Sequence, residues 1–180
     1  MKDDMSLDAT DRLDLQDLLL RYVAAARLKD NEPALREVFT EDAVLDGPRG
    51  YYEGPSGLTA FAEQERGSQS SVFDASSSTI GHTIIANVLA DGDGDVATID
   101  AKLFKIRFRI ETGSVDIAAS GSYHCDARRV SGKWRIARRL CQIDGLPQFR
   151  ETADYAAGRR WVRTDSGWLL AEADESAVGE

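Results

Sequence analysis

Hydrophobic residues in the first third of the chain recur at intervals of three and four, the spacing of one face of a helix. Shorter apolar stripes predict a helix over residues 31–39, with Asn31 as its cap, and another over residues 56–65. Before them, the pattern predicts an amphipathic helix over residues 10–28, whose apolar face consists of Leu15, Leu18, Leu19, Tyr22 and Ala26.

Strand-like patterns follow, first briefly and then over most of the second half. Residues 43–46 are predicted as a short strand with residues 51–52 paired back on to it, whereas the Ser-rich residues 67–78 are predicted as a loop at the edge of a binding site. Four longer strands, separated by Gly-containing turns, are predicted at residues 79–90, 96–110, 115–128 and 134–143.

Three helices followed by four long strands with short connections are typical of an α+β fold. We expect the strands to form an antiparallel meander, with the helices on one face of a curved sheet and a ligand pocket between the two layers. Residues 1–146 would form this domain. Residues 147–180 depart from the pattern and are predicted to form a C-terminal arm or hairpin with a frayed acidic tail.

Composition narrows the possible functions. The chain has 180 residues with 22 Lys and Arg against 31 Asp and Glu, and this net charge of −9 disfavours binding to nucleic acid. No apolar run is long enough to cross a membrane and the N-terminus lacks a signal-peptide pattern, so we expect a cytoplasmic protein. The two cysteines, Cys125 and Cys141, fit neither a disulfide framework nor a zinc site and are expected to be small buried hydrophobes. No phosphate-binding glycine loop, nucleophile triad or metal-ligand set is present, which favours a protein without cofactor or metal.

Several short segments occur in an order and spacing that resemble the SnoaL-like branch of the nuclear-transport-factor-two-like superfamily. They cover about residues 12–144, and they are Arg21-Tyr22, the segment 35–44, Gly54, His82 with Asn87-Val88, the segment 121–124 and the segment 132–139. The resemblance implies a cone-shaped α+β barrel around a pocket. Its members include dehydratases, isomerases, polyketide cyclases, dehydrochlorinases and non-catalytic binders.

In the dehydratase-like members, a Tyr on the first helix, an Asp soon after it and a His on the first long strand form the acid/base set. The resemblance places Tyr22 and His82 at the first and third positions, but Arg27 stands where the family has Asp. An Arg would lower the pKa of a nearby His, or it would stabilise an enolate or carboxylate. The alternative for Arg27 is a structural role at the C-terminal end of the first helix.

Other candidates come from the strands and from the remaining helix. Arg139 matches a position where family members often place a pocket Arg, the alternative being a solvated edge charge. Asp46 and Asp100 are alternative carboxylates, and mixed polarity over residues 96–110 predicts a bulge that would turn Asp100 or Lys105 into the pocket. His124 is expected to face solvent. The predicted ligand-binding residues are Asp46, Tyr52, Phe61, Asp100, Phe104, Lys105 and Tyr123.

These residues favour a cofactor-free acid/base enzyme acting on a hydrophobic ring-containing metabolite, by dehydration, isomerisation or cyclisation. His82 would be the base or acid, Tyr22 a hydrogen-bond donor, and Arg27 or Arg139 a stabiliser of negative charge. The alternative is a non-catalytic binder or a structural subunit like the β subunits of ring-hydroxylating dioxygenases. In either case we expect a small hydrophobic ligand, no nucleic-acid or membrane partner, and a homodimer or homotrimer.

Overall fold

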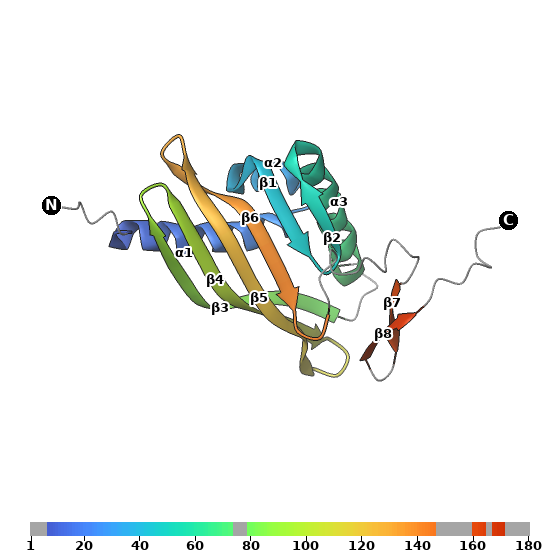
Figure 1. The fold of residues 1–180 in the computed structure, drawn as a ribbon. Coiled ribbons are helices and arrows are strands. Elements are labelled where there is room, and N and C mark those ends of the chain that lie inside the picture. Colours follow the sequence, from blue (N-terminus) through green and yellow to red (C-terminus); the bar gives the residue numbers. More distant parts are fainter. Residues whose placement is uncertain (1–6, 74–78, 147–159, 165–166, 172–180) are drawn as a thin grey trace.

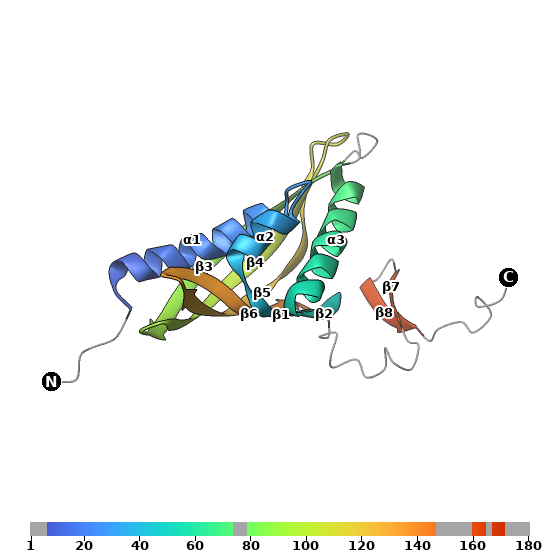
Figure 2. The same ribbon diagram turned by 90° about the horizontal axis from the view of Figure 1, so that it is seen from above.

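Three helices lie together on one face of a curved sheet in the computed structural model, which describes residues 7–73, 79–146, 160–164 and 167–171 (Figures 1 and 2). The helices are α1 (Ala9–Ala25), α2 (Glu32–Val38) and α3 (Gly54–Phe73). This two-layer arrangement confirms the predicted α+β class.

The sheet has six strands in the order β2-β1-β6-β5-β4-β3, so it is curved but not closed, and β2 and β3 are its edges. Its pairs are antiparallel except for β1 with β6, which is parallel. The strands are β1 (Phe39–Gly47), β2 (Gly50–Glu53), β3 (Thr79–Asp93), β4 (Val96–Arg109), β5 (Val115–Val130) and β6 (Lys133–Ile143).

Helix α1 begins at Asp8, whose carboxylate accepts a hydrogen bond from the backbone N–H of Asp11 at 2.7 Å. Asp11 in turn accepts hydrogen bonds from Arg129 of β5 at 2.6 Å and from the indole of Trp134 of β6 at 3.1 Å. The acidic first turn thus both complements the helix dipole and fixes the helix to the sheet.

The end of α3 and the cap of α2 differ from the prediction. Helix α3 continues to Phe73, through much of the stretch predicted as a loop, while residues 74–78 lie outside the described residues. Serine costs at most about 0.7 kcal/mol relative to alanine in a helix, so a helix anchored by Leu58 and Phe61 continues through a polar stretch. Asn31 precedes α2 but does not cap it with its side chain, which instead donates to the carbonyl of Ala62 in α3 at 3.0 Å.

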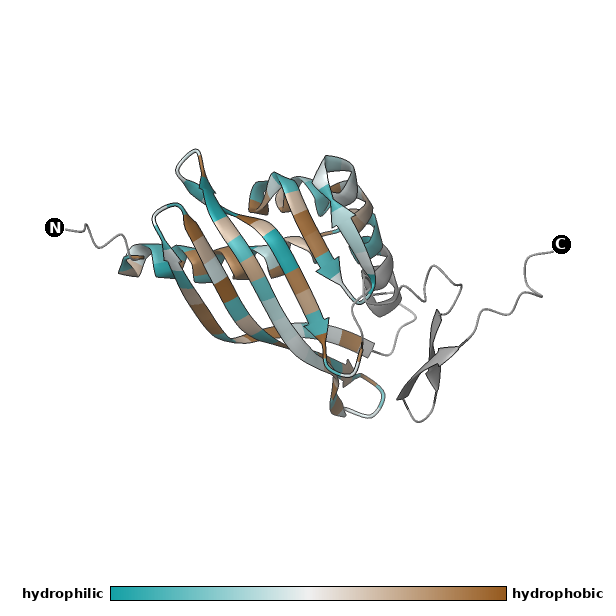
Figure 3. Ribbon diagram, viewed as in Figure 1, coloured by the Kyte–Doolittle hydropathy of each residue, from teal (hydrophilic) through white to brown (hydrophobic). Residues whose placement is uncertain are grey.

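Apolar and polar residues alternate along the strands, as Figure 3 shows. Ile99, Leu103 and Ile136 of the strands are completely buried and belong to one core with α1 residues such as Leu15 and Leu18, which places the apolar face of the sheet under the helices. Both cysteines are buried, as predicted, and neither forms a disulfide with another described residue. Glycine is required at position 121 because a Cβ there would collide with the carbonyl oxygen of Gln142 on the neighbouring strand.

Two further strands form a separate two-stranded antiparallel sheet near the C-terminus. They are β7 (Arg160–Thr164) and β8 (Gly167–Ala171), and Trp161 pairs with Leu170. Residues 147–159 and the tail from 172 onward, predicted as part of the arm, lie outside the described residues. None of the helices within the described ranges is both long and apolar enough to span a membrane.

Candidate active site

A buried hydrogen bond joins α1 to the sheet at the centre of the layer between them. The guanidinium Nη1 of Arg139 on β6 donates to the hydroxyl oxygen of Tyr22 at 2.7 Å, and Nη2 donates to the carbonyl of Asp46 at 3.4 Å. Tyr22 is 3 % exposed and Arg139 5 % exposed. The structure therefore brings together two of the four residues that the sequence predicted as catalytic.

Aromatic rings surround the guanidinium. Its central carbon lies 4.9 Å from the ring centre of Phe61, 5.7 Å from that of Tyr22 and 6.0 Å from that of Tyr123. The two tyrosine rings also meet edge to face, with their centres 5.6 Å apart. We call Tyr22, Phe61, Tyr123 and Arg139 the interior cluster.

No carboxylate forms an ion pair with Arg139 within the part of the chain that the structure describes, and its Nε has no hydrogen-bond partner there. A guanidinium keeps its proton in proteins, so the interior cluster carries a buried positive charge. Burying an unpaired charge is costly, and such groups concentrate where a ligand or a transition state supplies the opposite charge.

The two tyrosines of the interior cluster stay protonated at neutral pH. Burial raises the pKa of Tyr22 to about 12, although the nearby Arg139 charge acts in the opposite direction. Burial, and then the neighbouring Tyr22, raise the pKa of Tyr123 well above its ordinary value. Because Tyr22 accepts a hydrogen bond from a cation, its own O–H is polarised and becomes a stronger donor.

The position of Arg139 depends on a bulge in β6. Trp134 and Ile136 point to the buried face, and regular alternation would then bring in Arg138 rather than Arg139. The pairing of β5 with β6 shifts after Ile136 and leaves Ala137 as an extra residue. The bulge thus turns Arg139 inward and leaves the side chain of Arg138 51 % exposed.

A bulge in β3 has the reverse effect on His82. Val88 and Ala90 pack toward the core, and so does Ile85, but the pairing with β4 shifts between Ala86 and Leu89, where Asn87 has a φ of 52°. The faces therefore exchange at this point, and His82 is exposed on the side away from the helices. The structure does not bring His82 to the interior cluster, and its role in proton transfer stays a prediction.

Arg27, the fourth predicted catalytic residue, is half-buried at the end of α1. Its guanidinium donates to the backbone carbonyl of Gly81 on β3 at 3.2 Å. This contact ties the end of the helix to the edge strand. The structure thus places Arg27 at the edge strand β3, and its catalytic role stays a prediction.

The predicted ligand-binding residues divide between the two faces of the sheet. Tyr52 packs edge to face on Phe61, with ring centres 5.7 Å apart, beside the interior cluster. Asp46 is buried, and its backbone carbonyl accepts the hydrogen bond from Arg139, whereas its carboxylate oxygen Oδ1 is buried without a hydrogen-bond partner among the described residues. Asp100 and Phe104 lie on the outer face, where Asp100 is 2.8 Å from His124. The side chain of His124 is 41 % exposed, which agrees with the expectation that it faces solvent.

Lys105 shares the inward face of β4 with Leu103 and Ala101. It pairs with Thr83 of β3 and with Ala119 of β5. The bulge predicted within residues 96–110 is not found, because the register shift after Lys105 leaves Ala118 of β5 as the extra residue. Regular alternation of β4 therefore places Lys105 on the inward face. Burial, and then the charges of Arg49 and Arg139, lower the pKa of Lys105, whereas Glu65 acts to raise it.

Glu65 and Arg49 were not predicted from the sequence. Glu65 lies on α3 beyond the predicted apolar stripe, and Arg49 lies in the turn between β1 and β2, so neither position carries a periodic signal. Gln64 donates to the carbonyl of Arg49 at 3.1 Å and holds this turn against α3. Both charges influence the pKa of Tyr52 and of Cys141.

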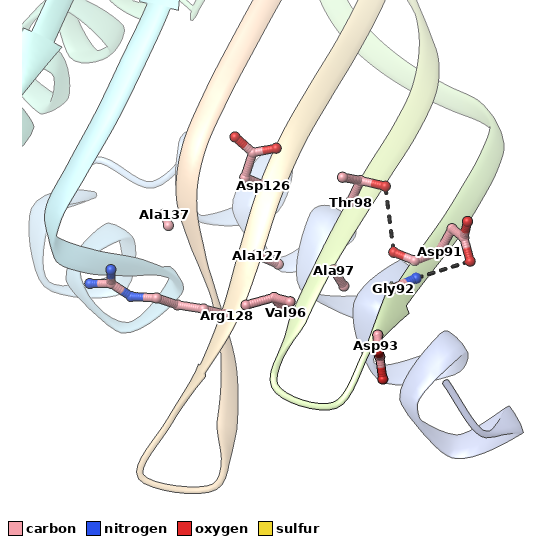
Figure 4. Close-up of a pocket in the computed structure, with 10 residues that line it drawn as sticks. All are labelled: Asp91, Gly92, Asp93, Val96, Ala97, Thr98, Asp126, Ala127, Arg128 and Ala137. Atoms are coloured by element: carbon pink, nitrogen blue, oxygen red, sulfur yellow. Dashed lines mark hydrogen bonds between the residues drawn. The ribbon is translucent and has the colours of Figure 1, made fainter. Parts of the chain in front are cut away.

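A shallow hollow of about 650 Å³ lies elsewhere, on the outer face of the sheet near the β3–β4 turn (Figure 4). Asp91, Asp126 and Arg128 are among its lining residues, and none of the residues predicted for the site lines it. Nor does any group of three or more His, Cys, Asp or Glu within the described ranges have the geometry to hold a metal ion.

A curved sheet covered on one face by helices is the architecture of the cystatin-like and nuclear-transport-factor-two-like class. The model of the SnoaL-like domain family matches residues 8–140. The chain therefore belongs to this family. Among curated proteins, none matches the chain.

Solved structures support the fold. A variant of a Mycobacterium tuberculosis protein of unknown function is 26 % identical over 74 % of this chain and 72 % of that chain, with a TM-score of 0.60. A Nostoc punctiforme protein of unknown function with a cystatin-like fold is 24 % identical over 78 % and 97 %, with a TM-score of 0.56. A Novosphingobium aromaticivorans protein described as a candidate aromatic ring hydroxylase is 25 % identical over 79 % and 94 %, with a TM-score of 0.57.

Proposed function

We propose that the protein is a cofactor-free enzyme that moves protons on a hydrophobic ring-containing metabolite, as a dehydratase, isomerase or cyclase does. The SnoaL-like family includes enzymes of these kinds. The interior cluster would bind the substrate ring among its aromatic side chains, and Arg139 and Tyr22 would stabilise the negative charge that develops on a substrate oxygen.

The observation that carries this proposal is the buried hydrogen bond from Arg139 to Tyr22 without a carboxylate counter-ion among the described residues. A preorganised cation and a polarised hydroxyl, held in a dry interior, stabilise an oxyanion more strongly than water does. A substrate that loses a proton next to its carbonyl group places such an oxyanion on an enolate oxygen.

Binding of 4-nitrophenol tests the charge preference directly, because its neutral and phenolate forms absorb at different wavelengths. We expect the protein to bind the phenolate and to lower the apparent pKa of the probe. Arg139→Met should weaken phenolate binding about 10- to 100-fold, the equivalent of one charge-assisted hydrogen bond.

Arg138→Met is the matched control, because Arg138 is the preceding residue on the same strand but its side chain is exposed. Tyr22→Phe provides a second, milder change at the site. Equal phenolate binding by the Arg138 and Arg139 variants, or no preference for the phenolate in the natural protein, would rule out the proposed oxyanion site.

Ring opening of 5-nitrobenzisoxazole tests turnover without knowledge of the natural substrate. In this reaction a base removes the ring C–H proton, the N–O bond breaks, and the released cyanophenolate carries the negative charge. We expect the natural protein and Arg138→Met to accelerate the reaction equally. Arg139→Met should be slower by at least about 10-fold, because it has lost the stabilising charge.

The similarity to the candidate aromatic ring hydroxylase favours a second function, that of a non-catalytic subunit of an oxygenase complex. This alternative expects no ring opening by the isolated chain. It also expects co-purification with a larger iron–sulfur protein, which assays of iron and acid-labile sulfide on the purified complex would detect.

A further inference from the structure

Lys105 is an ammonium group placed on the inner face of the sheet. Strand β4 alternates between completely buried residues, such as Ile99 and Leu103, and exposed ones, such as Asp100 and Lys102. Lys105 continues the inner series as a half-buried residue, and the register shift directly after it leaves Ala118 of the neighbouring strand β5 as an extra residue. Bulges are more frequent beside active sites than elsewhere in sheets.

This ammonium has no hydrogen bond or ion pair with any of the residues that the structure describes. Three charges on other elements influence the pKa of Lys105. Arg49 of the β1–β2 turn and Arg139 of β6 disfavour the protonated form of Lys105, whereas Glu65 of α3 favours the protonated form. Cys141 on β6 acts on the pKa of Lys105 in the same direction as Glu65. A half-buried lysine whose pKa is lowered by nearby cations is more readily neutral, and a neutral amine can accept a proton.

We infer that Lys105 is the catalytic base of this site, the group that takes the proton from a substrate carbon while Arg139 and Tyr22 hold the resulting oxyanion. This inference rests on the proposed function and assigns the proton acceptor within it. It gives the role of base to a residue on β4 rather than to His82, which lies on the opposite face of the sheet.

The step balances within the site. The neutral Nζ of Lys105 accepts the proton, the C–H bond breaks, and its electron pair forms the C=C bond of an enolate whose oxygen carries the charge. The new ammonium then returns the proton, either to another carbon, which isomerises the substrate, or to a departing hydroxyl group, which leaves as water. No oxidant, reductant or co-reactant is needed.

The rate of 5-nitrobenzisoxazole opening as a function of pH tests the inference. In the natural protein we expect the rate to rise with pH as Lys105 loses its proton, with a midpoint below the ordinary lysine value of 10.5. Lys105→Met should remove this rise and lower the rate about 10²- to 10⁴-fold, the usual contribution of a general base. Lys105→Gln is a second variant in case the Met variant does not fold.

Lys102→Met is the matched control, because Lys102 lies on the same strand with its side chain on the exposed face. It should keep the natural rate and pH profile. Lys105→Met should also retain 4-nitrophenolate binding, since the oxyanion site remains. This combination of retained binding and lost turnover is the result that supports the inference.

Two results would overturn it while leaving the proposed function intact. In the first, phenolate binding and ring opening depend on Arg139, but Lys105→Met keeps the natural pH profile. In the second, His82→Ala removes the rise with pH and Lys105→Met does not. If the natural protein neither binds the phenolate nor opens the ring, the proposed function itself fails.

Discussion

Arg139 and Tyr22 are expected to stabilise each other but not to stabilise the protein, because the pair places a charge in the core. The perturbation that separates these effects is a cycle of Tyr22→Phe, Arg139→Met and the double variant. Each side chain is at least 95 % buried, so water cannot replace a lost hydrogen bond without rearrangement.

The two single variants differ in what they leave behind. Tyr22→Phe removes the acceptor at 2.7 Å and leaves the buried guanidinium with one bond fewer, at a cost of about 1.5–3 kcal/mol. Arg139→Met removes the donor, at a cost of about 1–3 kcal/mol, and the contact with Phe61, worth up to about 2 kcal/mol. It also removes the desolvation penalty of the charge, which is several kcal/mol.

For Arg139→Met these contributions largely cancel, so we expect stability near that of the natural protein or slightly above it. In the double variant no polar group of the pair is left without its partner, and replacing both partners by apolar groups is nearly neutral or stabilising. The double variant should therefore be more stable than the sum of the single effects by about 1.5–3 kcal/mol.

Equilibrium unfolding in urea measures these differences, provided that the dependence on urea concentration is the same for all four proteins. A loss of about 3–5 kcal/mol in Arg139→Met alone would show that Arg139 belongs to a structural ion pair and is not held for a ligand. Additive effects, within about 0.5 kcal/mol, would show that the two side chains do not interact as described.

Two predictions concern the scaffold. Asp11→Ala removes the acceptor that links α1 to Trp134, and should cost about 1.5–3 kcal/mol in urea unfolding. Hydrogen bonding in the folded state lowers the pKa of Asp11. The stability that Asp11 contributes is therefore fully present above its unfolded pKa of 3.8 and is lost as the pH falls through its folded pKa. If the difference in unfolding free energy between the natural protein and Asp11→Ala is unchanged at about pH 3, this explanation is wrong. Gly121→Ala should cost about 1–3 kcal/mol because its Cβ collides with the carbonyl of Gln142, whereas Gly47→Ala, whose nearest contact is 3.4 Å, should cost clearly less in the same assay.

Periodicity alone predicted the helices and the long strands, because each element buries one face and its apolar residues repeat accordingly. The end of α3 was not predictable in this way, since residues 63–71 of the helix are polar or glycine and carry no periodic apolar signal. The parallel pairing of β1 with β6 was also hidden, because residues so far apart in sequence leave no local trace of their pairing.

The sequence predicted which residue types gather between the layers better than it predicted which way each side chain points. Tyr22 lies on helix α1, and the helical spacing that predicted its place on the apolar face is not affected by β-bulges. On a strand, the face to which a side chain points depends on whether its position is odd or even. One extra residue therefore moves all the side chains that follow it to the opposite face. The bulge at Ala137 turns Arg139 inward, and the bulge near Asn87 turns His82 outward, so bulges decide which of these two predicted residues lies on the inner face.

The distribution of charge bears on the kind of ligand that enters. The chain has a net charge of −9, yet the interior cluster contains the cation Arg139 and Lys105 lies on the same inner face. An approaching anion would meet an unfavourable exterior field before it reached these groups, whereas a neutral molecule would not. The positive charges of the interior then stabilise the substrate only as it loses its proton. Groups that bind the charged transition state but not the neutral ground state raise the reaction rate rather than the affinity for substrate. A neutral ring compound that becomes an oxyanion only within the site is therefore the ligand that this distribution favours.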